Sequence, residues 1–203
     1  MGSETGRVTV ISARGLGRRF GSKRVLRDLD LEVRSGEVLL VTGPNGSGKS
    51  TLLALMAGLL APTEGELEVD LPRGRIGYLA HESLVYKELT ALENLDLYGR
   101  LYHVPERRET TGALLERFGL WDARHQRVGS FSRGMQQRLA LCRVLLHGPE
   151  LLLLDEPHSS LDADASSLVD VLLSELAGQT TMAVATHDPN RVQRLATQSL
   201  VLA

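Results

Sequence analysis

Short apolar runs alternate with segments of helical periodicity along this chain. Residues 38–41, 151–154 and 181–186 form apolar runs, which are typical of strands buried on both faces of a sheet. Residues 136–146 and 165–176 instead carry apolar side chains every three or four positions, as amphipathic helices do. Strands that alternate with helices in this way predict a parallel α/β core.

Further, weaker strand patterns and a helical insertion occur elsewhere in the chain. Strands are expected at residues 8–11, 25–33, 66–69 and 75–79, where apolar positions alternate or form short runs between turn residues. These strands all precede the helical insertion in the chain.

The helical insertion is expected from Thr90 to about Leu120, where leucines recur at helical spacing. Thr90 is followed three residues later by Glu93, a capping box that predicts a helix start. A further helix is expected to start at residues 104–106, where Pro105 occupies a position that a first helical turn tolerates.

Composition narrows the class of protein without identifying it. A chain of 203 residues suggests one domain. The net charge of −2 gives no electrostatic reason to expect nucleic-acid binding as a main role. No apolar run is long enough to span a bilayer, and residues 1–10 have no signal-peptide core. We therefore expect a cytoplasmic protein whose membrane role, if any, comes through a partner.

Several reactive or bulky residues are expected to be structural. The single cysteine, Cys142, excludes an internal disulfide framework and lies in a helical apolar run, where it is expected to fill the core. The remaining histidines show no metal-ligand spacing and are expected at the surface: His103, His125, His147 and His158. Tyr98 and Trp121 are expected to be packing groups of the helical insertion.

The first chemical signal is a phosphate cradle at residues 43–50. It reads Gly43, Pro44, Asn45, Gly46, Ser47, Gly48, Lys49, Ser50, with Thr51 next, between an expected strand and an expected helix. Such a turn directs backbone N–H groups into one hollow at a helix N-terminus, which favours anions. Lys49 can reach the β- and γ-phosphates of a nucleotide, and the Ser50 hydroxyl can ligate Mg²⁺.

Two acidic residues and a histidine follow the later buried strands. Asp155 and Glu156 close the run at 151–154, and the carboxyl ends of parallel strands face the ligand crevice. Asp155 is expected to hold Mg²⁺, directly or through water. Glu156 can polarise a water for attack on the γ-phosphate. His187 follows the next strand and is expected to contact the γ-phosphate.

A second anion-binding helix start lies far from the first. Ser132 can cap the helix that follows it, and Gly134 leaves backbone N–H groups open. One nucleotide does not need two such termini from one chain. A dimer with nucleotide between two copies would use both.

Together these motifs make the chain similar, over essentially its whole length, to the ATP-binding subunits of ABC transporters. The matching segments are Walker A at 43–51, Walker B with its glutamate at 151–156, the signature at 131–135, the D-loop at 160–162, and the switch histidine His187. The aromatic residue that stacks on adenine in this family would be Phe20.

Three residues depart from the family pattern. Arg133 replaces a glycine and Met135 a glutamine in the signature, a form that occurs in cassettes of exporters. His81 stands where the family usually has a glutamine that senses Mg²⁺ and the attacking water, so His81 is a candidate metal contact. His81 followed by residues 89–95 is similar to the haem-exporter ATPases of cytochrome c maturation (CcmA-like).

The resemblance implies a P-loop NTPase core with an antiparallel β subdomain and a helical insertion that carries the signature. Residues 1–203 would form one ATP-binding domain, with 1–80 and 140–203 as the nucleotide-binding core and 82–138 as the helical subdomain. It further implies a head-to-tail homodimer that binds ATP and Mg²⁺ between Walker A of one copy and Ser132, Arg133 and Gly134 of the other. The dimer would lie on the cytoplasmic side of the membrane against an integral permease.

Four alternatives remain open. The chain could serve another ABC exporter, of the drug, lipid or polysaccharide type. It could be a soluble ABC ATPase of DNA repair or translation, although it lacks their usual coiled-coil insertion or second cassette. A small-molecule kinase would have no use for the Ser132 segment or the D-loop. A nucleotide-gated scaffold without hydrolysis is disfavoured by Glu156.

Overall fold

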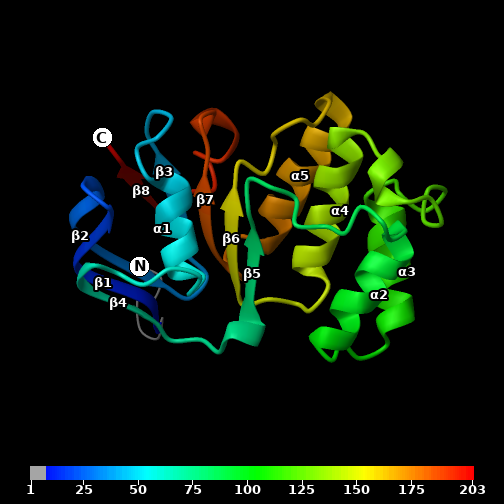
Figure 1. The fold of residues 1–203 in the computed structure, drawn as a ribbon, viewed down its shortest axis with the longest axis horizontal. Coiled ribbons are helices and arrows are strands. Elements are labelled where there is room, and N and C mark those ends of the chain that lie inside the picture. The colour runs from blue at the N-terminus through cyan, green and yellow to red at the C-terminus, as the bar shows by residue number, and fades with distance from the viewer. Residues whose placement is uncertain (1–7) are drawn as a thin grey trace, which may run out of the picture.

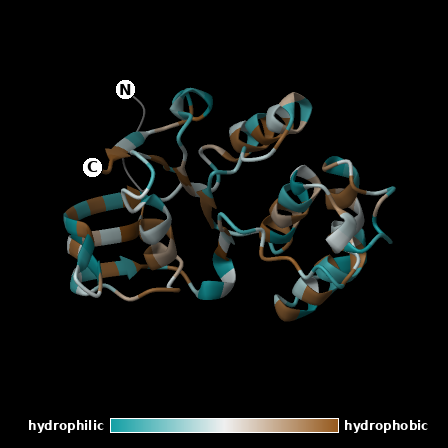
Figure 2. Cartoon of the chain, turned by 45° about the horizontal axis from the view of Figure 1, so that its top comes forward, coloured by the Kyte–Doolittle hydropathy of each residue, from teal (hydrophilic) through white to brown (hydrophobic). Residues whose placement is uncertain are grey.

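The computed structural model describes residues 8–203 and contains two sheets and five α-helices in that range (Figure 1). The smaller sheet is antiparallel, in the order β2-β1-β4. Its strands are β1 (Thr9–Phe20), β2 (Lys23–Arg34) and β4 (Glu64–Val69). Figure 2 shows hydrophobic and hydrophilic residues alternating along these strands, as one buried and one solvated face require.

The larger sheet is parallel throughout, in the order β5-β6-β7-β3-β8. Its strands are β3 (Val38–Thr42), β5 (Ile76–Leu79), β6 (Leu151–Asp155), β7 (Thr181–Ala185) and β8 (Gln198–Val201). The predicted parallel α/β core is confirmed, and the strand expected at 75–79 belongs to it as β5, whereas the strands expected at 8–11, 25–33 and 66–69 lie in the antiparallel sheet.

Helices cover both faces of the parallel sheet. In Figure 1, α1 (Lys49–Met56) lies on one side of β6, and α4 (Arg133–Leu145) and α5 (Ala163–Leu176) lie on the other. Beyond α4, α2 (Ala91–Leu101) and α3 (Arg107–Arg117) form the end of the molecule farthest from the antiparallel sheet. Three single 3-10 turns occupy residues 73–75, 128–130 and 189–191.

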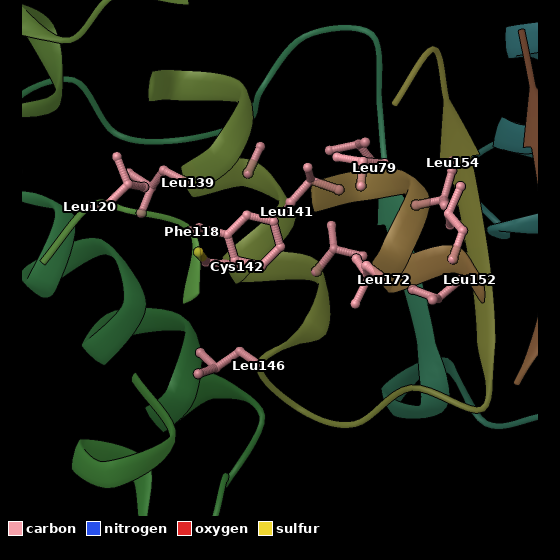
Figure 3. Packing of buried hydrophobic residues seen from close by; sticks show 14 of the residues in the cluster. Leu79, Phe118, Leu120, Leu139, Leu141, Cys142, Leu146, Leu152, Leu154 and Leu172 are labelled. Atoms are coloured by element: carbon pink, nitrogen blue, oxygen red, sulfur yellow. The ribbon is translucent and has the colours of Figure 1, made fainter. Parts of the chain in front are cut away.

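Side chains alternate along each strand and build two separate cores. Leu152 and Leu154 of β6 belong to the cluster beneath α4 and α5, whereas Leu151 and Leu153 belong to the cluster beneath α1 and the antiparallel sheet. Figure 3 shows Leu152 and Leu154 facing Leu172 of α5, with the α4 side chains beyond. Burial on both faces explains why these strands are continuous apolar runs.

The structure corrects several expectations at the ends of elements. β1 and β2 are both 12 residues long, because bulges carry their pairing past Gly15 and Gly17. β8 was not expected. The further helix expected to start at 104–106 is α3, with Glu106 as its N-cap and Arg107 as its first residue, so Pro105 lies just before the helix and not in its first turn.

Some of the residues expected to be structural or at the surface lie where they were predicted, and others do not. Cys142 is fully buried, as expected, and burial raises the pKa of its thiol. The expected surface position of His147 was wrong, because its ring is half-buried and stacks on Tyr102 with centroids 4.1 Å apart. His158 is not at the surface either, since only 12% of its side chain is exposed. Trp121 is 37% exposed, with Arg124 over its ring.

Among residues 8–203, no helix is long and apolar enough to cross a membrane.

A buried amide secures the chain between the parallel sheet and α2. Thr90 and Glu93 form the predicted capping box at the start of α2. One turn later, Asn94 is completely buried, and its Oδ1 accepts a hydrogen bond of 2.8 Å from the backbone N–H of Tyr86. Its Nδ2 donates to the carbonyl oxygens of Tyr86 and Thr90, both at 2.9 Å. This one side chain therefore satisfies the N–H and carbonyl of Tyr86 and the carbonyl of Thr90, at the end of a segment that has no regular structure.

We expect Asn94→Ala to lower the free energy of unfolding by about 1–3 kcal/mol, because the N–H of Tyr86 loses its partner. Urea unfolding measures this loss. The matched control is Asn190→Ala, at an exposed position, which should change stability by less than about 0.5 kcal/mol. Equal effects of the two substitutions would contradict the role given to Asn94.

Candidate functional site

The loop between β3 and α1 has the backbone shape that the phosphate-cradle motif predicts. Gly43 and Gly48 have φ angles of 145° and 105°, in the region that favours glycine. A Cβ on Gly43 would lie 2.3 Å from the carbonyl oxygen of Leu202, and one on Gly48 would lie 2.9 Å from side-chain atoms of Val25 and Leu26. No described side chain caps the start of α1, which leaves its first N–H groups for an anion.

Lys49 is held over this loop. The residue is only 7% exposed, and its Nζ donates to the carbonyl oxygens of Gly43 at 2.8 Å and Pro44 at 3.1 Å. These neutral acceptors hold the ammonium group where a phosphate oxygen would be a stronger, charge-assisted partner. The lysine is thus already positioned for the ligand that its motif predicts.

Asp155 has the properties of a cation ligand. It ends β6, it is 3% exposed, and its Oδ2 is buried with no hydrogen-bond partner among the described residues. Burial raises the pKa of Asp155, and a hydrogen bond with the Ser50 side chain opposes that shift. A buried, unpaired carboxylate oxygen beside a hydroxyl is a suitable ligand set for Mg²⁺. Asp155 and Ser50 are therefore the residues that fit the ion.

Glu156 and His187 contact each other. His187 Nδ1 lies 2.7 Å from Glu156 Oε2, although the two residues come from the ends of different strands. The histidine side chain is 71% exposed and the glutamate side chain 14% exposed. Glu156 also has a left-handed backbone with φ of 51°, a conformation that costs energy in a non-glycine residue and is concentrated at functional sites.

A cleft of about 620 Å³ brings most of the predicted residues together. Its lining includes Asn45, Gly46, Gly48, Lys49, Ser50, Thr51, His81, Asp155, Glu156 and His187. Three further residues that no sequence motif predicts also line the cleft, namely Lys23, Val25 and Ser159. Lys23 and Val25 lie on β2, whose sequence contains no phosphate-binding motif, so only the tertiary fold places them here.

Phe20 lies beside the cleft but not in its lining. It is 45% exposed, and it pairs in register with Lys23, which does line the cleft. The Arg18 guanidinium lies over the ring, 4.6 Å from its centroid. The tip of the β1–β2 hairpin therefore places an exposed aromatic ring opposite a residue that lines the phosphate cleft.

The signature residues 132–134 are not in the lining of this cleft, as the two-copy hypothesis requires. Ser132 caps α4, with its Oγ accepting a hydrogen bond of 3.2 Å from the N–H of Met135. Ser132 and Arg133 are exposed. Arg133 lines a second groove of about 730 Å³ with His81, and Gly134 packs against the carbonyl oxygen of Ser160. None of the signature residues 132–134 lines the phosphate cleft of its own chain.

A phosphate loop after β3, a buried acid at the end of β6 and a parallel sheet define a P-loop nucleotide-binding protein. The family model described as "ABC transporter" matches residues 26–159. The chain belongs to the ABC transporter family, as an ATP-binding and ATP-hydrolysing protein. The predicted fold class is thereby confirmed as the cassette fold of this family.

Relatives with different names are equally similar to the chain. The daunorubicin resistance ATP-binding protein DrrA3 of Streptomyces coeruleorubidus is 39% identical over 93% of this chain and 63% of its own length. The cytochrome c biogenesis ATP-binding export protein CcmA of Cupriavidus necator is 38% identical over 88% of this chain and 83% of its own length. The CcmA-like resemblance is therefore not singled out.

One solved structure that is similar to this chain is a dimer. The dimeric post-hydrolysis state of the ATP-binding cassette MJ0796, bound to ADP and Pi, superposes with a TM-score of 0.85 at 28% identity. The match covers 95% of this chain and 94% of that chain. That cassette forms a dimer with nucleotide products bound.

We expect Asp155→Asn to stabilise the nucleotide-free protein at neutral pH while it removes Mg²⁺-dependent hydrolysis. The pKa of Asp155 is higher in the folded than in the unfolded chain, so ionisation disfavours folding. This cost is absent below the unfolded pKa, and it grows as the pH rises through the folded pKa. Urea unfolding between about pH 4 and about pH 8 should therefore show the variant gaining on the wild type as pH rises.

Glu150→Gln is the matched control, because Glu150 is exposed in an ion pair with Arg75 just before β6. Its pH profile of stability should follow the wild type. A variant at Asp155 that is less stable than the wild type at every pH would contradict the assignment of an uncompensated buried charge.

Proposed function

We propose that this chain is the ATPase subunit of an ABC exporter and that it works as a head-to-tail homodimer. The observation that carries the proposal is the separation of two nucleotide-binding features. The phosphate loop shares one cleft with Asp155, Glu156 and His187, whereas Ser132, Arg133 and Gly134 are absent from the lining of that cleft. Two copies related by a two-fold axis place the phosphate loop of each copy against the Ser132 helix start of the other.

Each ATP binds first to the phosphate loop. The loop N–H groups of 43–48 and the Lys49 ammonium hold the phosphates through charge-assisted hydrogen bonds. Phe20 stacks on adenine, which its exposure and its position across from Lys23 support. Ser50 and Asp155 are the residues that would hold Mg²⁺, and His81, which also lines the cleft, would be a third contact. When bound, the ion neutralises charge on the β- and γ-phosphates.

Hydrolysis depends on the pair formed by Glu156 and His187. Glu156 orients a water in line with the γ-phosphate and accepts its hydrogen bond. His187 holds the Glu156 carboxylate by the 2.7 Å contact, and its exposed ring reaches the γ-phosphate, where it stabilises the developing charge. Ser132, Arg133 and Gly134 of the second copy close the site from the other side. In that position Arg133 adds a positive charge that the usual glycine lacks.

Loss of the γ-phosphate removes the group that bridges the two copies, so the dimer opens. The helical subdomain at 82–138, with His81 at its hinge, passes this motion to an integral membrane permease on the cytoplasmic side of the membrane. The identity to CcmA and the histidine at 81 favour haem export for cytochrome c maturation. The comparable identity to DrrA3 favours a drug-type exporter as the second candidate.

Glu156→Gln should retain ATP binding and lower kcat for hydrolysis by about 10²–10⁴-fold, because the amide does not accept a proton from the water. Phosphate release and nucleotide binding measure the two effects separately. The variant should also accumulate an ATP-bound dimer in size-exclusion chromatography. An unchanged rate would remove Glu156 from the role.

Ser132→Arg should leave ATP affinity of the monomer within about twofold yet lower hydrolysis at least about tenfold, which corresponds to about 1.4 kcal/mol. The larger side chain fills the space that the second copy's phosphates must occupy. Ser167→Arg on α5 is the control, because Ser167 is exposed and lies outside the cleft. Normal turnover of Ser132→Arg would contradict a shared site.

A further inference from the structure

A hydrogen-bonded network behind the cleft joins the two loops that carry Glu156 and His187. His158 Nε2 lies 2.8 Å from Asp170 Oδ1. Arg191 Nη1 donates to the other oxygen of the same carboxylate, Asp170 Oδ2, also at 2.8 Å. Asp170 lies in the middle of α5, so a single carboxylate contacts the segment after β6 and the segment after β7.

The His158 end of this network is largely buried and hydrogen-bonded. Only 12% of the His158 side chain is exposed, and in the neutral ring the bond to Asp170 requires the tautomer protonated on Nε2. Within the same turn, the N–H of Ser159 donates to the carbonyl oxygen of Glu156 at 2.9 Å. His158 therefore fixes the turn that starts at Glu156.

The Arg191 end fixes the second loop. Arg191 also pairs with Asp188 at 3.7 Å, and Asp188 directly follows His187. The backbone N–H of Asp188 donates to Oγ1 of Thr186 at 3.0 Å. Both neighbours of His187 thus have fixed positions, although the His187 side chain itself is exposed.

The turn that starts at Glu156 also contacts the signature helix. Gln137 Nε2 of α4 lies 3.4 Å from the carbonyl oxygen of Pro157 and 3.5 Å from that of Glu156. Gly134 of the same helix packs against Ser160. This turn therefore lies between α4 and α5, and the Asp170 network is its attachment on the α5 side.

We propose that Asp170 is a positioning residue for ATP hydrolysis: by holding His158 and Arg191 together it keeps Glu156 and His187 in contact. This inference rests on the roles proposed for Glu156 and His187. Asp170 does not line the cleft, so it acts through the two loops and not on the nucleotide. Without the Asp170 carboxylate, the two loops lose their common hydrogen-bond acceptor. The 2.7 Å contact between His187 and Glu156 then loses the interaction that fixes both loops.

The test compares Asp170→Asn and Asp170→Ala with Glu175→Gln in the full chain with its membrane partner. Glu175 is the matched control, because it lies on the same helix in an exposed ion pair with Arg117. Both Asp170 variants should lower kcat about tenfold, while KM for ATP and the Kd of a fluorescent ATP analogue stay within about twofold. Glu175→Gln should change none of these. Asp170→Asn preserves the shape of the side chain and covers the case in which the alanine variant does not fold.

A second comparison separates positioning from a general structural role. If Asp170 acts through His187, Asp170→Asn should have little further effect in a His187→Ala background, because coupled residues are not additive. A full additional loss there would overturn the inference. So would a kcat within twofold of the wild type, or a parallel loss of affinity and thermal stability. The proposed function itself fails on a different result, namely equal hydrolysis by wild type and Glu156→Gln.

Discussion

The parallel pairing of β6, β7 and β3 is the constraint on which the site depends. Ala185 of β7 is in register with both Asp155 of β6 and Val41 of β3. The three strands therefore end in one row, and the residues that follow them face the same crevice. A shift of one residue in either pairing would turn the apolar side chains of that strand to the wrong core. The same packing that buries the leucines thus determines the spacing of the acids, the histidine and the phosphate loop.

The site is assembled at a cost in stability. Asp155 is buried with an unpaired oxygen, Lys49 is buried against neutral carbonyls, and Glu156 has a left-handed backbone. Each of these features is unfavourable in the nucleotide-free protein. A cation beside Asp155 and a phosphate beside Lys49 would compensate the two buried charges. The two apolar cores on either side of the sheet are what allow these residues to keep their positions without the ligand.

The parts predicted from sequence are those in which local pattern and chemistry coincide. Asp155, Glu156 and His187 each follow a continuous apolar run, so their place at the ends of buried strands could be inferred without tertiary information. The capping box at Thr90 is likewise a local signal. β8 could not be predicted, because its four residues alternate weakly between half-buried and exposed positions.

Other features depend on contacts between distant parts of the chain. Lys23 reaches the cleft only because the β1–β2 hairpin folds over the phosphate loop, and the strand itself has no motif for that. His158 and His147 were expected at the surface, since isolated histidines show no spacing pattern. Their partners, Asp170 and Tyr102, lie 12 and 45 positions away respectively and are brought to them by helix packing.

The carbonyl oxygen of Leu202 occupies the space where Gly43 would carry a side chain. The N–H of the same residue donates to the carbonyl oxygen of Thr42 at 2.8 Å. The floor beneath the phosphate-binding turn is therefore made by residues about 160 positions later in the polypeptide. Nucleotide affinity should therefore depend on whether β8 is paired with β3. Loss of that pairing would weaken ATP binding, although no residue that contacts the nucleotide is changed.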